Sequence, residues 1–266
     1  MSDFVLTNDR LDDKVFIVTG STQGLGEFIA RRIAHLGAQG IVVCGRKTNQ
    51  GEQVAAELTS MGVKSIFVKA DLAVEADCRT ITQRCDETFG RVDGLVNAAG
   101  LSSRGHLDDT TVELWDKLFK VNTRAPFILM QETARIMKRE GIRGSIVNII
   151  TMGAYGGPPV LMAYCSSKGA LSILTKNVAQ TLLTDHIRVN GINIGWMETP
   201  GEHEVQKAAG QPENWLELAN ASRPFGRLLH RKDIAPMVTY LLSDQAQMMT
   251  GSIIDLDQTI HGPYPD

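Results

Sequence analysis

The stretch TGSTQGLGEFIARRIAHLG, residues 19–37, decides the fold that we expect for this 266-residue chain. It holds Gly20, Gly24 and Gly26 between an apolar run at 15–18 and a segment whose apolar residues recur at helical spacing. The short β-branched run predicts a buried strand, so the glycines fall on a turn from a strand into a helix. Helix N-termini offer unpaired N–H groups and the positive end of a dipole, which together suit a phosphate. A plain tight turn is the alternative, because glycine spacing alone does not identify a ligand.

The alternation of strand and helix continues along the chain. Strands are expected at 14–19, 40–44, 64–69, 92–97, 145–150, 187–193 and 252–256. Helical patterns fill 24–36, 49–61, 74–89, 111–139, 161–184 and 232–242. Short apolar strands between amphipathic helices predict a doubly wound parallel α/β sheet of about seven strands, covered on both faces, within one domain spanning 1–266. The region 195–230 is rich in Gly, Pro and polar residues, and we expect a substrate lid at about 196–222.

Composition and charge exclude several classes of partner. The formal net charge is -3 and no basic run occurs, so nucleic acid is not an expected partner. The sequence has no apolar segment of membrane-spanning length, and MSDFVLTNDR at the start lacks the apolar stretch of a signal peptide. The four cysteines form no C-x-x-C pair and have no histidines at metal spacing. We therefore expect a cytoplasmic protein with reduced, mostly buried thiols, without metal and without a membrane partner.

The end of the second expected strand bears on the choice of cofactor. Dinucleotide-binding folds often place an acid here for the ribose 2′-hydroxyl, but the sequence IVVCGRKTNQ, residues 41–50, has Gly45 followed by Arg46. Without a carboxylate there is no repulsion toward a 2′-phosphate, and a guanidinium can bind one through two charge-assisted hydrogen bonds. A solvated surface arginine is the alternative. We expect NADP as the preferred cofactor, with NAD as the second choice.

The next two strand ends carry further candidates for cofactor binding. Asp71, followed by Leu72, could accept a hydrogen bond from an adenine amino group or cap the next helix, and the two roles are compatible. At the end of the fourth strand, Asn97, Ala98 and Gly100 are small enough to let a cofactor pass over the strand tip.

Tyr164 and Lys168 lie four residues apart in a helical pattern, so their side chains share one face. A phenol titrates near pH ~10, too high for efficient proton transfer at neutrality, and a nearby ammonium favours the phenolate. A Tyr-x-x-x-Lys pair is common on protein surfaces without a catalytic role. Here the pair follows the fifth strand of a chain that begins with the glycine turn, and this position favours a catalytic role.

Together these motifs resemble the classical short-chain dehydrogenase/reductase (SDR) family. Residues 19–26 match its T-G-x-x-x-G-x-G turn, residues 97–100 match N-A-A-G, and Tyr164 and Lys168 match Y-x-x-x-K. The resemblance covers roughly residues 10 to 257 in the order and spacing of the family. It implies a Rossmann fold, hydride transfer with NAD(P) and an oligomer, usually a tetramer.

The resemblance assigns Tyr164 as the general acid in reduction or the general base in oxidation. Lys168 would lower the pKa of the phenol and hold the nicotinamide ribose. Thr151 stands where the family has serine; it keeps the hydroxyl but adds a methyl group and stiffens χ1. The alternative is that Thr151 only fills a strand end and leaves the enzyme weak or inactive.

Asn122 is the fourth catalytic candidate. Pro126 has no N–H, so the carbonyl of Asn122 loses its normal helical partner, and a kink there leaves an acceptor for water. In the family this position holds a water that joins the lysine to a proton relay. A polar helix residue without a role is the alternative.

After the sixth strand the chain departs from the family, with Ile194-Gly195 in place of Pro-Gly. By resemblance, a backbone group of Met197 contacts the nicotinamide carboxamide, and the hydroxyl of Thr199 reaches the carboxamide or the phosphates. The predicted cofactor site therefore comprises Gly20, Ser21, Thr22, Gln23, Gly24, Leu25, Gly26, Arg46, Asp71, Leu72, Asn97, Ala98, Gly100, Tyr164, Lys168, Gly195, Met197 and Thr199.

The expected lid and rim are polar and include indoles, which suits hydroxyl groups and sugar faces better than a long acyl chain. The residues are Arg104, His106, Trp196, Glu198, Glu202, His203, Glu204, Gln211, Asn214 and Trp215. We therefore predict interconversion of a secondary alcohol and a carbonyl, on a sugar, sugar acid or polyol. The alternatives are a 3-oxoacyl-thioester reductase and, in another class, a non-catalytic NADP-binding sensor or assembly protein.

The helical patterns 111–139 and 161–184 are the expected assembly faces of a homotetramer, with a dimer as the alternative. The tail has Asp257-Gln258 where the family has Asp-Gly, and its Gly-Pro-Tyr-Pro ending at 262–265 cannot form a helix. The tail either lies across a neighbouring subunit or is disordered.

Overall fold

The computed structural model describes residues 10–262. Their core is one seven-stranded sheet in which every neighbouring pair is parallel, in the order β3-β2-β1-β4-β5-β6-β7. The strands are β1 (Val15–Thr19), β2 (Gly40–Gly45), β3 (Lys64–Lys69), β4 (Gly94–Asn97), β5 (Ser145–Thr151), β6 (Arg188–Ile194) and β7 (Ile253–Leu256). The predicted doubly wound parallel sheet is confirmed. Its strand order reverses between β1 and β4, where such folds bind their ligands.

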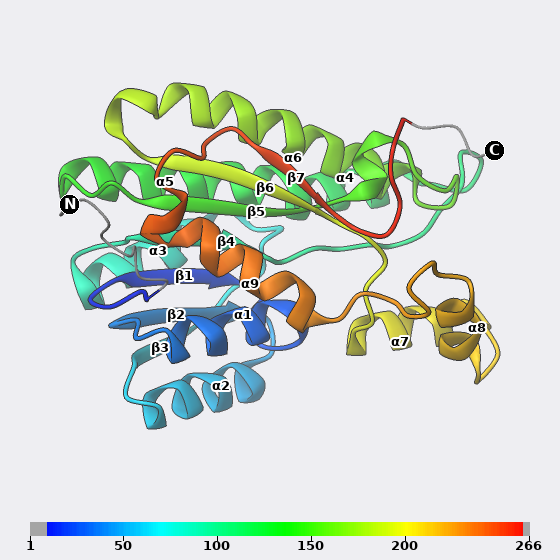
Figure 1. The fold of residues 1–266 in the computed structure, drawn as a ribbon, viewed down its shortest axis with the longest axis horizontal. Coiled ribbons are helices and arrows are strands. Elements are labelled where there is room, and N and C mark those ends of the chain that lie inside the picture. Colours follow the sequence, from blue (N-terminus) through cyan, green and yellow to red (C-terminus); the bar gives the residue numbers. More distant parts are fainter. Residues whose placement is uncertain (1–9, 263–266) are drawn as a thin grey trace, which may run out of the picture.

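Helices cover both faces of the sheet, and α7 and α8 stand apart from it (Figure 1). They are α1 (Gly24–His35), α2 (Thr48–Ser60), α3 (Glu75–Phe89), α4 (Val112–Phe119), α5 (Ala125–Arg139), α6 (Met162–Thr181), α7 (Pro200–Ala208), α8 (Trp215–Ala221) and α9 (Arg231–Leu242). None of the helices within residues 10–262 is long and apolar enough to cross a membrane.

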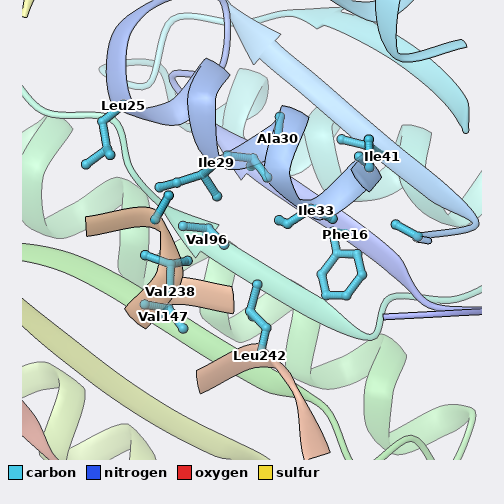
Figure 2. Packing of buried hydrophobic residues seen from close by; sticks show 14 of the residues in the cluster. Phe16, Leu25, Ile29, Ala30, Ile33, Ile41, Val96, Val147, Val238 and Leu242 are labelled. Atoms are coloured by element: carbon cyan, nitrogen blue, oxygen red, sulfur yellow. The ribbon is translucent and has the colours of Figure 1, made fainter. Parts of the chain in front are cut away.

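Two apolar clusters fix the sheet between its helices. On one face Ile29 and Ile33 of α1 and Val238 of α9 pack over the strands (Figure 2). On the other face Ile81 of α3 and Leu129 of α5 belong to a second cluster. At roughly 25 cal/mol per Å² of buried apolar surface, these clusters are the main stabilising contribution to the fold.

Two helical predictions need correction. The pattern at 111–139 is not one helix, because a π-helical turn, Lys120–Arg124, separates α4 from α5. The absent N–H of Pro126 explains why regular i to i−4 bonding fails there. The region 195–230 is not irregular throughout, because it contains α7 and α8. Pro200 at the first position of α7 and the capping hydroxyl of Thr199 are the start signals of α7.

The glycine turn at the end of β1 has two kinds of constraint. Gly20 and Gly24 both have φ of +64°, a left-handed conformation that favours glycine. A Cβ on Gly20 would lie 2.9 Å from the Cα of Ala99, and one on Gly26 would lie 2.5 Å from the carbonyl oxygen of Gly20. A Cβ on Gly24 would meet nothing within 4 Å. The chain itself therefore excludes side chains at Gly20 and Gly26, while Gly24 leaves space for a ligand.

This difference predicts unequal effects of two alanine substitutions. Gly24→Ala adds only backbone strain, about 1 kcal/mol, because its side chain enters open space. Gly20→Ala adds the same strain and also pushes β1 away from Ala99, which costs about 1–3 kcal/mol more. Urea unfolding of both variants measures the two losses. Equal losses in the free energy of unfolding would show that the approach to Ala99 is not tight.

Candidate active site

A cavity of about 440 Å³ lies at the carboxyl ends of the strands, beside the point where the strand order reverses. Most of the predicted site residues line it. These are Gly20, Thr22, Gln23, Gly24, Leu25, Gly26, Arg46, Asp71, Leu72, Ala98, Gly100, Tyr164, Lys168, Met197 and Thr199. The cavity extends from the glycine turn to the first turn of α7, so one elongated ligand can contact both ends.

The N-terminus of α1 fits the phosphates of a dinucleotide. Gln23, the residue before the helix, forms no side-chain cap, so no side chain occupies the first N–H groups of α1. Those groups start at Gly24, where the space is open, and the turn lines the cavity. Unpaired N–H groups at the positive end of a helix dipole are the donors that a phosphate requires.

The tip of β2 explains the absence of an acid there. A Cβ on Gly45 would lie 2.7 Å from the Cγ2 of Thr22, so a carboxylate side chain does not fit without movement. Arg46 lines the cavity with an exposed side chain, and neighbouring Lys47 donates a hydrogen bond to Gln23 at 3.4 Å. This corner is therefore cationic, which suits a phosphate on the ribose.

Asp71 lines the cavity, but one of its oxygens already has a role in the chain. Its Oδ1 accepts a hydrogen bond from the backbone N–H of Ala73 at 2.9 Å. Helix α3 begins later, after Val74, so Asp71 closes the turn before the helix instead of capping it. The other carboxylate oxygen remains for a donor such as an amino group.

Tyr164 and Lys168 line the cavity, and Thr151, which does not line it, lies beside Tyr164. Burial raises the pKa of Tyr164 to about 12, partly opposed by a hydrogen bond with Thr151. Burial also lowers the pKa of Lys168 to about 8. The ammonium of Lys168 donates a hydrogen bond of 2.7 Å to the carbonyl of Ile149.

The direction of the phenol's pKa is opposite to our expectation from the sequence. We expected the ammonium of Lys168 to favour the phenolate, but removal of Tyr164 from water outweighs any such effect in the protein alone. A positive ring bound beside the phenol would act in the expected direction.

Asn122 is fully buried in the π-helical turn, and its side-chain atoms all have partners in the chain. Its Oδ1 accepts from the N–H of Leu101, and its Nδ2 donates to the carbonyl of Leu101 and to Ser167, each at 2.9 Å. The amide therefore ties the loop after β4 to α6. The water that the sequence predicts on the backbone carbonyl of Asn122, which has no N–H at Pro126 to accept from, stays a prediction.

The segment that follows β6 presents backbone groups to the cavity. Met197 pairs with Leu229 in an isolated parallel bridge that uses the carbonyl of Trp196 and the N–H of Glu198. The bridge therefore leaves the N–H and carbonyl of Met197 available to a ligand. The hydroxyl of Thr199 accepts from the N–H of Glu202 at 3.0 Å and still has a proton to donate.

Three predicted cofactor residues do not line the cavity. Ser21 is buried and donates to the carbonyl of Val18 at 2.6 Å. Asn97 is buried and donates to Asn148 at 2.8 Å. A Cβ on Gly195 would collide with Asp257, so this glycine makes room for the tail. The structure thus gives these residues roles in holding the strand ends.

The cavity also contains residues that the sequence prediction of the site did not include. Lys117 and Ser102 line it. Lys117 lies four residues before Val121, another lining residue, so helical spacing near Asn122 was the signal that could have identified it. Of the expected lid and rim residues, Glu202 of α7 lines the cavity and the others do not.

The tail after β7 is ordered through residue 262 by specific contacts. Gln258 accepts a hydrogen bond from the N–H of Phe225 and donates one to the carbonyl of Arg227, each at 2.7 Å. His261 lies against Tyr155, with ring centroids 4.9 Å apart. The Gly-Pro-Tyr-Pro ending predicted to be non-helical extends beyond the described residues from 263 onward.

Comparison with known protein families and sequences places these features in context. Residues 20–261 match the family model described as enoyl-(acyl carrier protein) reductase. The chain is 34% identical to an uncharacterized oxidoreductase of Thermotoga maritima, over 92% of this chain and 96% of that protein. It is also 34% identical to an NADP-dependent (R)-specific alcohol dehydrogenase of Lentilactobacillus kefiri, over 94% of this chain and 97% of that protein.

Solved structures agree with these sequence relatives. A short-chain type dehydrogenase/reductase from Mycobacterium marinum superposes with a TM-score of 0.87 at 27% identity, covering 96% of this chain and 98% of that one. A gluconate 5-dehydrogenase from Burkholderia cenocepacia, in complex with NADP and tartrate, gives a TM-score of 0.85 at 28% identity, covering 95% of this chain and 97% of that one.

The buried ammonium predicts a stability that depends on pH. At pH 7 folding desolvates the charge of Lys168, and a pKa of about 8 against 10.5 corresponds to a cost of about 3 kcal/mol. Lys168→Met removes this cost but also the hydrogen bond to Ile149, worth about 1 kcal/mol. We therefore expect the variant to be about 2 kcal/mol more stable than the wild type at pH 7.

The advantage should shrink as the pH rises from 8 to 10.5, because the folded wild type loses this proton before the unfolded chain does. Urea unfolding of both proteins at pH 7 and pH 10 measures the difference. A difference that is the same at both pH values would contradict burial of a charged lysine.

Proposed function

Since the chain belongs to the short-chain dehydrogenase/reductase family and is an enzyme acting on CH–OH groups with NAD(P), we propose that it interconverts a secondary alcohol and a carbonyl on a sugar, sugar acid or polyol. One observation carries this proposal. Tyr164 and Lys168 both line the cavity that begins at the glycine turn, and the side chain of Thr151 lies near enough to the phenol of Tyr164 to oppose the rise of its pKa. The carboxylate of Glu202 in the cavity wall favours a hydroxylated substrate over a long acyl chain.

In this proposal each side chain has a separate task. The hydroxyl of Thr151 donates to the substrate oxygen and orients it. Tyr164 gives its proton to that oxygen in reduction and takes a proton from it in oxidation. Lys168 and the carbonyl of Asn122 restore the phenol's proton through water. The bound dinucleotide supplies or accepts the hydride at its nicotinamide ring.

Replacing Tyr164 with Phe removes the proton that this chemistry requires. We expect turnover to fall by about 10²–10⁴-fold, the range associated with a general acid or base, while cofactor affinity stays within about twofold. Absorbance of NADPH at fixed enzyme concentration, with a panel of sugars, polyols and simple ketones, measures turnover. Quenching of protein fluorescence measures cofactor binding. A variant that retains wild-type turnover would rule out Tyr164 as the acid.

We propose NADP as the preferred cofactor because of the corner around Arg46. An acid at position 45 is disfavoured by Thr22, and the guanidinium at position 46 lines the same cavity as the phosphate turn. The NADP-dependent relative from Lentilactobacillus kefiri and the NADP complex of the gluconate 5-dehydrogenase agree with this preference.

Arg46→Asp reverses the charge at this corner. It should repel a 2′-phosphate and accept a hydrogen bond from a ribose 2′-hydroxyl, so kcat/KM for NADP relative to NAD should fall at least about tenfold, or about 1.4 kcal/mol. The control Arg84→Asp, at an exposed position of α3, makes the same charge change at a residue that does not line the cavity. An unchanged ratio in Arg46→Asp would contradict the assignment.

Two alternatives remain useful as comparisons. The family model carries the name of an acyl carrier protein reductase, so 3-oxoacyl thioesters belong in the substrate panel. A non-catalytic NADP-binding sensor or assembly protein is disfavoured, because Thr151 keeps a hydroxyl that reaches the phenol of Tyr164.

We further propose a cytoplasmic homotetramer with residues 196–222 as a substrate lid, and a dimer as the smaller alternative. An apolar groove of about 720 Å³ lies between α6 and the segment from the end of α4 to the start of α5, where Phe127 and Ile173 are exposed. These are helices of the two patterns that the sequence indicates as assembly faces, and apolar grooves of this kind are typical of interfaces between identical subunits.

A further inference from the structure

One carboxylate lies in the cavity wall beside the proposed acid. Glu202, in the first turn of α7, lines the same cavity as Tyr164 and Lys168. Its side chain is 17% exposed, and its negative charge contributes to the raised pKa of Tyr164, after burial as the main cause. A charge that acts on the phenol is close enough to act on a substrate bound to that phenol.

Hydrogen bonds fix one carboxylate oxygen of Glu202 and leave the other as an acceptor. The indole N–H of Trp196 donates to Oε1 at 2.9 Å, and Gln206 donates to the same atom. The guanidinium of Arg104 approaches Oε1 to 3.7 Å without forming a hydrogen bond. Within the described residues, no partner is bonded to Oε2. The side chain is therefore fixed in place and retains an acceptor.

Arg104 offsets part of the charge of Glu202 but does not occupy its second oxygen. It is absent from the cavity wall, and its Nη2 lies 3.7 Å from Oε1, which is an ion-pair distance without a hydrogen bond. The carboxylate, not the guanidinium, is the charged group of this pair that faces the cavity.

We infer that Glu202 selects the substrate: Oε2 accepts a hydrogen bond from a hydroxyl of an uncharged polyhydroxylated alcohol or ketone, and its charge rejects substrates that carry a carboxylate near the reacting carbon. This inference rests on the proposed function and narrows it. A fixed carboxylate stabilises a hydroxyl donor through a charge-assisted hydrogen bond. The same charge repels an anionic group, which is the repulsive component that specificity often requires.

Matched pairs of substrates test the inference. D-Glucitol and D-gluconate differ at one end of the same carbon chain, and ethyl acetoacetate and acetoacetate differ only by the ester. We expect the wild type at pH 7 to prefer the uncharged member of each pair at least about tenfold in kcat/KM. Glu202→Gln keeps the shape and the acceptor for Trp196 but removes the charge, so it should reduce that preference at least about tenfold.

Glu204→Gln is the matched control. It removes the same charge from the same helix, but Glu204 is exposed and absent from the cavity wall, so its preference should equal that of the wild type. An equal shift in both variants would indicate a general effect of net charge and contradict the inference.

Other outcomes are equally decisive. A wild type that prefers the anionic members, or that turns over neither pair while reducing other ketones, would overturn the role of Glu202 and leave the proposed oxidoreductase chemistry standing. Two results would instead contradict the proposed function itself. One is a wild type that turns over no substrate of the panel, and the other is an activity that Tyr164→Phe leaves unchanged.

Discussion

The rest of this structure depends on the approach of Gly20 to Ala99. Gly20 directly follows β1 and Ala99 lies in the loop after β4, the two strands between which the strand order reverses. With no Cβ at Gly20, the turn can lie on the neighbouring loop and aim the N-terminus of α1 along the sheet edge. The cavity follows from this contact, because its walls are the turn on one side and the loop after β4 on the other.

Burial raises the pKa of Tyr164 and lowers the pKa of Lys168, and both shifts favour the uncharged form of the side chain. It keeps Tyr164 protonated and makes the proton of Lys168 easier to lose. Without a cofactor, the protein therefore contains a neutral phenol on the same helix face as an ammonium that loses its proton more easily than usual. Such a pair is poised to respond to a charge that enters the cavity, since each additional charge acts on both groups at short range.

The sequence was sufficient for the sheet, because short apolar strands and the glycine turn have strong local signals. Tyr164 and Lys168 were predictable for the same reason, since four-residue spacing fixes a common helix face. Ser21 and Asn97 were placed in the cofactor site by motif alone, but their side chains satisfy buried partners beneath it. Glu202 was expected in the rim together with nine other residues, but the sequence could not single it out, because which rim residue enters the cavity wall depends on the packing of α7 and not on any local pattern.

The π-helical turn at Lys120–Arg124 has a consequence for the helices on either side. A π turn contains an additional residue, so the side chains after it are rotated by about 100° relative to an unbroken α-helix. This change of phase lets α4 pack against α6 while α5 packs against α3. Removing or inserting one residue within 120–124 would turn one helix against its neighbours. Sequence length through this segment is therefore constrained more tightly than the identity of its surface residues.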